Sequence, residues 1–430
     1  MRYLLLICFI SIVANCYSQI KEPKAKQKFV IEAKESLVEL DLSTIDFSDL
    51  EFLKKELQGK RIVYLGESNH HTETQNKIKL KLIRFLNSEM GFNVLAFESN
   101  ISSCLHANMI KDQVDPFYLL THSILGCWRT ESNIELMKFI QSSGINLTGF
   151  DPNQNANIQD RIYYQSIFTE DTVFANYLYQ LDSIYLHYNI RRVKYLRSKT
   201  FDKQNEIILD SLKTYLTKSY SKLKSNLLFK PYKYRDELIH FLRLSIKNKL
   251  ATLKTCNQLN EHFTKQYVTN NYREQLMQDN LEFLLDTLFP TEKVIVWAHN
   301  GHISKGGTST HIAVSKNNSL GYRLDAKYKS ESYTIGLYGY PGTIGKGYLN
   351  ETEKLPLPKK NSLESVLFLT NEDLFFIKTN IQAFHKPVYN FGEGNVQSIS
   401  NISDCYDAVI FARNLEPSIL INKYDHELNE

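Results

Sequence analysis

The sequence predicts an α/β fold in which a mostly parallel sheet is flanked by helices and carries a large all-helical insertion that serves as a cap. Six short apolar runs end abruptly at polar residues, which is typical of strands buried on both faces of a parallel sheet. An amphipathic segment separates the first two runs, so the order is strand, helix, strand. Between Gly149 and Gly301 the chain has no glycine, which favours long helices over turns.

The first segment, residues 1–18, is predicted to be a signal peptide and not part of the fold. Arg2 precedes the apolar run 3–14, which is too short to cross a bilayer. Cleavage before Gln19 would release a secreted or periplasmic protein with no integral membrane segment. Lipid attachment at Cys16 is the alternative, but an asparagine precedes this cysteine where lipid attachment prefers a small residue.

The α/β core is expected to comprise residues 40–155 and 290–415. Its strands are expected at the six apolar runs, which are 61–65, 93–97, 145–150, 293–298, 333–337 and 407–412. A helix is expected between the first two runs and ends at Gly91. Its apolar side consists of Ile78, Leu82, Phe85 and Leu86. This first unit is therefore a βαβ element.

Residues 156–289 are expected to form the helical insertion. Apolar residues recur there at spacings of three and four, in one stripe on each side of Pro231. The first stripe consists of Ile208, Leu212, Leu216, Tyr220, Leu223 and Leu227, and the second of Leu238, Leu242, Ile246, Leu250 and Leu253. We expect these helices to shape a pocket above the core.

The composition is that of a folded globular protein. Of 430 residues, 43% are hydrophobic and 23% are charged, which argues against a disordered or fibrous chain. The formal net charge of +4 is small and its basic residues are dispersed, so no nucleic-acid partner is expected. The mature chain would keep four cysteines, Cys104, Cys127, Cys256 and Cys405. They allow three disulfide pairings, or they are single buried thiols.

Ionisable residues directly follow four of the expected strands. They are Glu67, His70 and His71 after the first strand, Glu98 after the second, Asp151 after the third, and His299 and His302 after the fourth. Parallel strands end at one edge of a sheet, where open α/β proteins bind ligands. Each residue alone could be a cap or a backbone hydrogen-bonding group, but four strand ends together indicate a site for acid–base chemistry or metal binding.

The chemistry expected at this edge uses water as the nucleophile. The sequence has no Gly-x-Ser-x-Gly elbow, no P-loop and no dinucleotide fingerprint. His299 and His302 are three residues apart, a spacing that suits zinc on a helix, but Gly301 places them in a loop. No cofactor is therefore expected, and a metal ion stays an alternative.

Two parts of the sequence resemble the erythromycin esterase family. The first is Leu65-Gly66-Glu67-Ser68-Asn69-His70, followed by Leu95-Ala96-Phe97-Glu98. The second is Trp297-Ala298-His299-Asn300, and Arg273, Met277 and Asn280 match the helix that leads into it. The resemblance extends over residues 60 to 415 and implies the hydrolysis of an ester, in some members the ring of a macrolide in antibiotic resistance.

The resemblance also implies roles for individual residues. His70 would be the general base that takes a proton from water, and Glu67 and Glu98 would orient it. His299 would position the substrate or stabilise developing charge. Arg273, Asn300 and His302 are alternative stabilisers of the oxyanion, and together with His71 and Asp151 they are the expected substrate-binding residues.

The sequence departs from the family after the first histidine. His71 occupies a position where many members have glycine, which puts macrolide activity in question. Lys79 replaces a basic residue of the family's helix or is simply solvated. Two further functions remain open: a metal-dependent hydrolase with His70, Glu98 and His299 as ligands, and a protein that binds haem or another small ligand without catalysis.

Overall fold

The structure is a computed structural model. It describes the core of the chain and part of the predicted insertion. The described residues are 30–38, 46–152, 164, 165, 168, 171–198, 210, 211, 214, 217–219, 221, 242–251, 253, 266–306, 318–347, 350–393 and 396–421. The predicted signal peptide and Cys256 lie outside them, as does the first apolar stripe of the predicted insertion.

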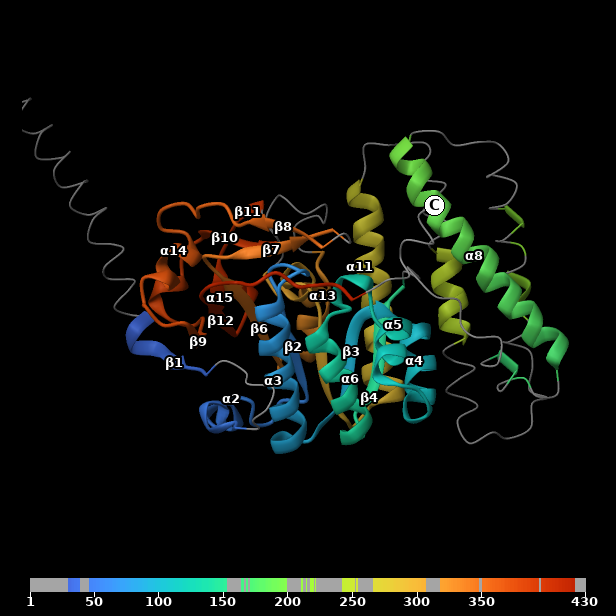
Figure 1. The fold of residues 1–430 in the computed structure, drawn as a ribbon, viewed down its shortest axis with the longest axis horizontal. Coiled ribbons are helices and arrows are strands. Elements are labelled where there is room, and N and C mark those ends of the chain that lie inside the picture. Colours follow the sequence, from blue (N-terminus) through green and yellow to red (C-terminus); the bar gives the residue numbers. More distant parts are fainter. Residues whose placement is uncertain are drawn as a thin grey trace, which may run out of the picture.

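The centre of the molecule is a mostly parallel sheet of eight strands (Figure 1), as predicted. The strands are β1 (Lys34–Ser36), β2 (Ile62–Leu65), β3 (Phe92–Asn100), β4 (Asn146–Asp151), β5 (Lys293–Trp297), β6 (Ser332–Gly339), β9 (Leu374–Lys378) and β12 (Ala408–Ala412). Their order is β1-β9-β12-β6-β2-β5-β3-β4. The six expected strands all form and run parallel, whereas β9 is antiparallel to β12 and β1. Strands β1 and β9 were not predicted from the sequence.

Side chains of each central strand alternate between two hydrophobic cores. In β5, Ile295 and Trp297 point to one face, and Val294 and Val296 point to the other. The first face is covered by α2 (Phe52–Glu56), α3 (Glu73–Met90), α5 (Pro116–Ser123) and α6 (Glu131–Ser143). The second is covered by α11 (Gln266–Phe283), α13 (Leu320–Tyr328) and α14 (Leu363–Phe368). Both faces are therefore buried, as continuous apolar strands require.

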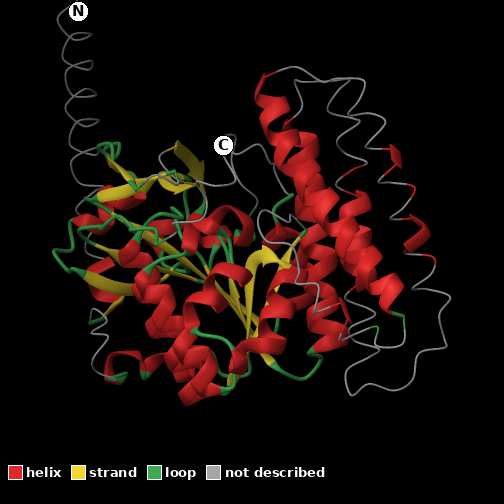
Figure 2. Cartoon of the chain, turned by 45° about the vertical axis from the view of Figure 1, so that its right-hand side comes forward, coloured by secondary structure: helices red, strands yellow, loops and turns green. Residues whose placement is uncertain are grey.

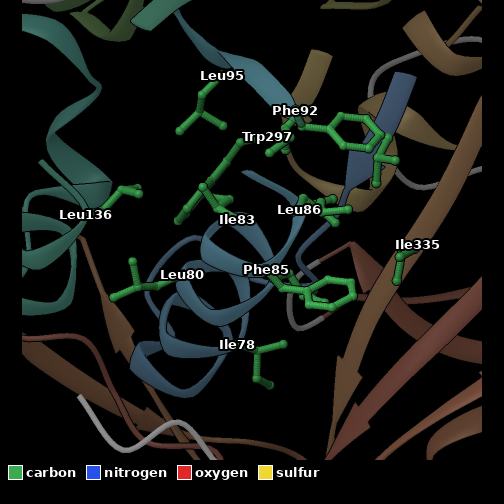
Figure 3. Packing of buried hydrophobic residues seen from close by; sticks show 14 of the residues in the cluster. Ile78, Leu80, Ile83, Phe85, Leu86, Phe92, Leu95, Leu136, Trp297 and Ile335 are labelled. Carbon is green, nitrogen blue, oxygen red and sulfur yellow. The ribbon is translucent and has the colours of Figure 1, made fainter. Parts of the chain in front are cut away.

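Helix α3 forms where its apolar periodicity predicts it and ends at Gly91. This glycine has a φ of 71°, a left-handed conformation that closes the helix with a bond from its N–H to the carbonyl of Asn87. Ile83, Phe85 and Leu86 pack against the sheet around Trp297 and Ile335 (Figure 3). The helix is thereby held directly after the loop that carries Glu67 and His70.

A helical region follows β4 in the sequence and lies beyond that edge of the sheet (Figures 1 and 2). It contains α8 (Thr172–Ser198), a helix over residues 242–251, and α11, which continues into a π-helical turn at Leu284–Leu288. Leu242, Ile246 and Leu253 of the second predicted stripe are buried in a separate core with α8, while Leu238 lies outside the described residues. The exact domain boundaries remain a prediction.

The remaining described elements are short. They are η1 (Ser48–Leu50), α4 (Ile101–Ile110), η2 (Lys111–Gln113), η3 (Gly126–Trp128), α12 (Asn300–Ile303), η5 (Gln382–Phe384), α15 (Ile402–Cys405) and two hairpins, β7 (Thr343–Lys346) with β8 (Glu351–Lys354) and β10 (Val388–Glu393) with β11 (Val396–Ser400). Cys104, Cys127 and Cys405 are free and buried. The prediction of single buried thiols is therefore confirmed for these three cysteines. Among the described helices, none has the length and apolarity that a membrane span needs.

Candidate active site

Four neighbouring strands deliver the candidate site residues to one edge of the sheet. These strands are β2, β5, β3 and β4, in spatial order, and all four are parallel. Because β5 lies between β2 and β3, His299 reaches the loop that carries His70. Glu98 lies within β3, where the pairing with β4 becomes irregular after Phe97. The prediction that these strand ends meet is confirmed.

Glu67 is the fully buried centre of the first charge network. Its Oε1 accepts hydrogen bonds from Nδ1 of His70 at 2.5 Å and from Nε1 of Trp128 at 2.8 Å. Its Oε2 accepts a hydrogen bond from Nζ of Lys79. Burial by itself would raise the pKa of Glu67, but Lys79 and His70 outweigh it and lower this pKa to about 2. Glu67 is therefore a fixed anion.

Lys79 is fully buried, so the expectation of a solvated lysine is wrong. Its ammonium group is paired with Glu67 and lies 3.6 Å from the ring centroid of Trp297, a cation–π arrangement. Burial lowers the pKa of Lys79 to about 8, although Glu67 opposes this shift. The lysine provides the countercharge that keeps Glu67 ionised.

His70 is oriented by three neighbours and remains partly exposed. Its Nδ1 donates to Glu67, its ring meets Trp128 edge-on with centroids 5.3 Å apart, and its centroid lies 4.9 Å from that of His299. The side chain keeps 34% of its surface exposed. With the proton on Nδ1, the lone pair is on Nε2, which has no hydrogen-bond partner among the described residues.

His299 is engaged by the backbone through both ring nitrogens. Nε2 lies 3.2 Å from the carbonyl oxygen of Ser68, and Nδ1 accepts a hydrogen bond from the N–H of Gly301. The geometry thus assigns the proton to Nε2. Burial, followed by the nearby His70, lowers the pKa of His299 to about 3. His299 is therefore a neutral ring that supports His70 and has no free nitrogen for a metal ion.

Glu98 is saturated by three donors. Oε1 accepts from Nη2 of Arg273 at 2.7 Å and lies 3.0 Å from Nε2 of His302, and Oε2 accepts from the N–H of His299. Burial would raise its pKa, but His302 and Arg273 outweigh burial and hold the pKa well below the usual value. Glu98 therefore fixes other groups and has little capacity to act as a base.

Arg273 reaches from α11 to the ends of β3 and β4. Its Nε and Nη2 both donate to the carboxylate of Asp151, a forked arrangement that fixes the guanidinium plane. The Arg273 side chain is 25% exposed, while Asp151 is fully buried. Direct contact between Asp151 and a substrate is thus contradicted, because its carboxylate lies beneath the arginine.

His302 is held as a cation between two carboxylates. Nδ1 donates to Glu274 at 2.5 Å and Nε2 faces Glu98. Burial would lower the pKa of His302, but Glu274 and Glu98 raise it to about 10. Because Nε2 carries a proton, the approach of Nη1 of Arg273 at 3.2 Å is a contact between two cations that share Glu98.

Asn300 does not line the site, which corrects its predicted role. Its side chain is fully buried, donates to the carbonyl of Leu337 and accepts from the N–H of the same residue. Asn300 therefore links the end of β5 to β6. His71, by contrast, is partly exposed next to His70, and its carbonyl accepts hydrogen bonds from Gly345 and Ser418.

Sequence reasoning did not assign site roles to Trp128 and Glu274. Trp128 lies between the second and third expected strands and shows no strand-end signal, and Glu274 directly follows Arg273 on α11. The hints for this helix were the motif matches at Arg273, Met277 and Asn280, and none of them pointed to Glu274. Among the described residues, no group of three or more His, Cys, Asp or Glu side chains is arranged to hold a metal ion.

A sequence model of the erythromycin esterase family matches residues 88–415, most of the chain. The chain belongs to the erythromycin esterase family. In this esterase-family protein the matched stretch contains Glu98, Arg273, His299 and His302, while Glu67 and His70 lie just upstream of it.

Known relatives of the esterase-family chain cover nearly its whole length. YbfO of Bacillus subtilis, whose name assigns it to the hydrolases, is 29% identical over an alignment of 408 positions that covers 89% of this chain and 90% of YbfO. The family and this name indicate a hydrolase.

Three solved structures share the fold of the esterase-family chain. A Bacillus cereus protein has a TM-score of 0.70 at 16% identity, covering 93% of this chain and 99% of its own. A succinoglycan biosynthesis protein has a TM-score of 0.69 at 20% identity, covering 92% and 98%. An erythromycin esterase mutant in its open conformation has a TM-score of 0.64 at 17% identity, covering 89% and 97%.

Proposed function

We propose that this protein hydrolyses carboxylic esters of small molecules, with water as the nucleophile and His70 as the general base. One observation carries the proposal. Nδ1 of His70 donates to the buried, ionised Glu67, so the lone pair of Nε2 is directed away from Glu67 on a ring that is partly exposed. An imidazole with this tautomer accepts a proton at Nε2, and the carboxylate stabilises the imidazolium that forms.

The reaction proceeds in two steps. A water molecule transfers a proton to Nε2 of His70 while its oxygen attacks the ester carbonyl carbon. The tetrahedral intermediate then breaks its bond to the alcohol oxygen, and the imidazolium returns the proton to that oxygen. The same carboxylate–histidine logic serves in catalytic triads, except that water replaces the serine.

Arg273 is the best candidate to stabilise the oxyanion. Asn300 is buried, and both nitrogens of His302 face carboxylates. Arg273 bonds its carboxylate partners through Nε and Nη2, and its side chain is partly exposed. Among the described residues, Nη1 approaches His302 but has no carboxylate partner. A cationic donor of this kind favours the charge that develops on the carbonyl oxygen.

The test is mass spectrometry of erythromycin and of p-nitrophenyl acetate after incubation with purified protein, with and without a chelator. We expect the unaltered protein to add one water to at least one ester in the presence of chelator. His70→Ala is expected to lower the rate by about 10²- to 10⁴-fold, the range for loss of a general base.

His385→Ala, at an exposed histidine outside the site, is the matched control and should keep the original rate. Retention of activity by His70→Ala would refute the proposed base. Loss of activity on chelation would favour the metal-dependent alternative. The macrolide itself is the less favoured substrate, because the side chain of His71 adds bulk beside His70.

A further inference from the structure

Helix α11 is fastened to the end of β4 at two points. Arg273 forks onto the carboxylate of Asp151, and Nδ2 of Asn280 donates to the carbonyl of the preceding residue, Phe150, at 2.8 Å. Seven residues separate Arg273 from Asn280, which is two helical turns, so both project from the same side of the helix. The position of Arg273 above Glu98 therefore depends on how α11 lies against β4.

Another helix of the helical region contacts α11 at the second of these points. Nδ2 of Asn248, on the helix over residues 242–251, donates to Oδ1 of Asn280 at 3.0 Å. Asn248 is 2% exposed and Asn280 is fully buried. The amide of Asn280 is thus fixed in one orientation, because a flip would break its bonds to both Asn248 and Phe150.

A buried ion pair ties this contact to the core of the helical region. Lys249, next to Asn248, pairs with Asp182 of α8, and Asp182 also accepts a hydrogen bond from Tyr164. All three side chains are almost completely buried, so their arrangement has little freedom to change. A path of buried polar contacts therefore runs from α8 to the end of β4, and its two halves are joined by the backbone between Lys249 and Asn248.

We propose that Asn248 and Asn280 are positioning residues. Through them, the position of Arg273 depends on how the helix over residues 242–251 packs against α11. The inference rests on the proposed function only for its catalytic consequence. Neither residue touches the reacting atoms. When Asn248 is lost, Oδ1 of Asn280 loses its donor, the amide is free to turn, and α11 loses its second anchor on β4.

The neighbouring residue offers a matched control. Lys247 pairs with Asp279, and each of these residues directly precedes one of the two asparagines on the same two helices. Their side chains are 52% and 33% exposed. An exposed pair contributes little to the packing of the helices. Lys247→Ala therefore removes a contact between the same elements without disturbing the buried path.

The experiment compares Asn248→Ala and Lys247→Ala in steady-state hydrolysis of p-nitrophenyl acetate. Loss of one buried hydrogen bond corresponds to about a fivefold to tenfold effect, and we expect kcat/KM of Asn248→Ala to fall by about that factor, whereas Lys247→Ala stays within about twofold. Asn248→Ser, whose hydroxyl can still donate, should recover part of the loss. In an Arg273→Ala background, Asn248→Ala should have no further effect on the rate.

A second measurement needs no substrate. Thermal unfolding is measured for Asn248→Ala, for Arg273→Ala and for the double variant Asn248→Ala/Arg273→Ala. The Tm shift of the double variant should differ from the sum of the two single shifts. Additive shifts would overturn the inference, whether or not the protein is an esterase. Failure of the unaltered protein to hydrolyse any ester would overturn the proposed function alone, and the Tm cycle would then decide the inference.

Discussion

At the scale of single residues, the site depends on buried carboxylates whose partners determine their chemistry. Glu67 bonds Lys79, Trp128 and His70, and it therefore serves as a permanent anion behind the proposed base. Glu98 lies in β3, two strands from β2 in the sheet, and its side-chain donors are Arg273 and His302. The first carboxylate orients a histidine that can exchange a proton, and the second fixes two cations.

Replacement of Lys79 by methionine should destabilise the fold. The variant leaves Glu67 as a buried carboxylate without its countercharge, for which we expect a loss of about 3–5 kcal/mol in the free energy of unfolding. Urea denaturation measures this loss. The double variant Lys79→Met/Glu67→Gln is the control, since it removes both charges and should recover much of the stability. A single variant as stable as the original protein would contradict the role of this pair.

Stability should also depend on His302 in alkaline solution. The folded-state pKa of His302 is raised to about 10 from an ordinary value of 6.5, so folding binds its proton more tightly. The resulting stabilisation is fully present below pH 6.5 and is lost as the pH rises toward 10. The free energies of unfolding of His302→Gln and of the original protein, measured by urea denaturation, should therefore converge as the pH rises from 6.5 toward 10. A constant difference would contradict the prediction, and His385→Gln at an exposed histidine controls for the loss of an imidazole.

At the scale of secondary-structure elements, the edge of the sheet is held together beneath the site. Asn300 follows β5 and bonds the backbone of Leu337 in β6. Strand β2 lies between β5 and β6, and Gly66 directly follows it. A Cβ atom on Gly66 would lie 2.0 Å from Oδ1 of Asn300. The glycine is needed here because the amide of Asn300 takes the space of a side chain.

Gly66→Ala should therefore displace Asn300 and disturb the strand ends. We expect a loss of about 1–3 kcal/mol in the free energy of unfolding, the usual result of overpacking, together with reduced hydrolysis. Gly91→Ala, at the end of α3, is the control. It has room for a Cβ atom but a φ of 71°, so it should cost about 1 kcal/mol without loss of activity. Equal activity of both variants would argue against the Asn300 contact.

At the scale of the whole molecule, the helical region lies beyond the β4 edge of the sheet and supplies α11, from which Arg273 enters the site (Figure 1). Helix α11 packs into a hydrophobic cluster of the core, whereas α8 and the helix over residues 242–251 share a separate cluster. Through α11 this region makes polar contacts with β4 at Phe150 and with α12 and α13 at Glu274 and Gln275. The site is therefore completed by a segment that is distant in the sequence from the strand ends.

Export of the protein is a further prediction at this scale. When the full chain is expressed in a Gram-negative bacterium, we expect periplasmic protein that begins at Gln19, as measured by intact mass. Replacement of Leu5 and Leu6 by arginine interrupts the apolar run and should leave the protein uncleaved in the cytoplasm. A membrane-associated product with lipid on Cys16 would favour the lipoprotein alternative, and unaltered chain that retains residue 1 in the cytoplasm would contradict export.

Much of the fold and part of the site could be predicted from the sequence. Apolar runs located six parallel strands, and the polar residues after them located Glu67, His70, Glu98 and His299. Lys79 was misjudged because a lysine in a salt bridge and a lysine in water look alike in a sequence. Asn300 was misjudged because its role depends on the backbone of β6, a strand that follows later in the chain.

The sequence by itself determined which segments are strands or helices and which side chains follow the strands, because periodicity and chain order are local properties. Only the tertiary structure decided the strand order, in which β5 enters between β2 and β3 and brings His299 against His70. It also decided the charge states of buried groups such as Glu67 and His302. Protonation depends on burial and on the nearest opposite charge, and both come from segments that meet only when the chain is folded.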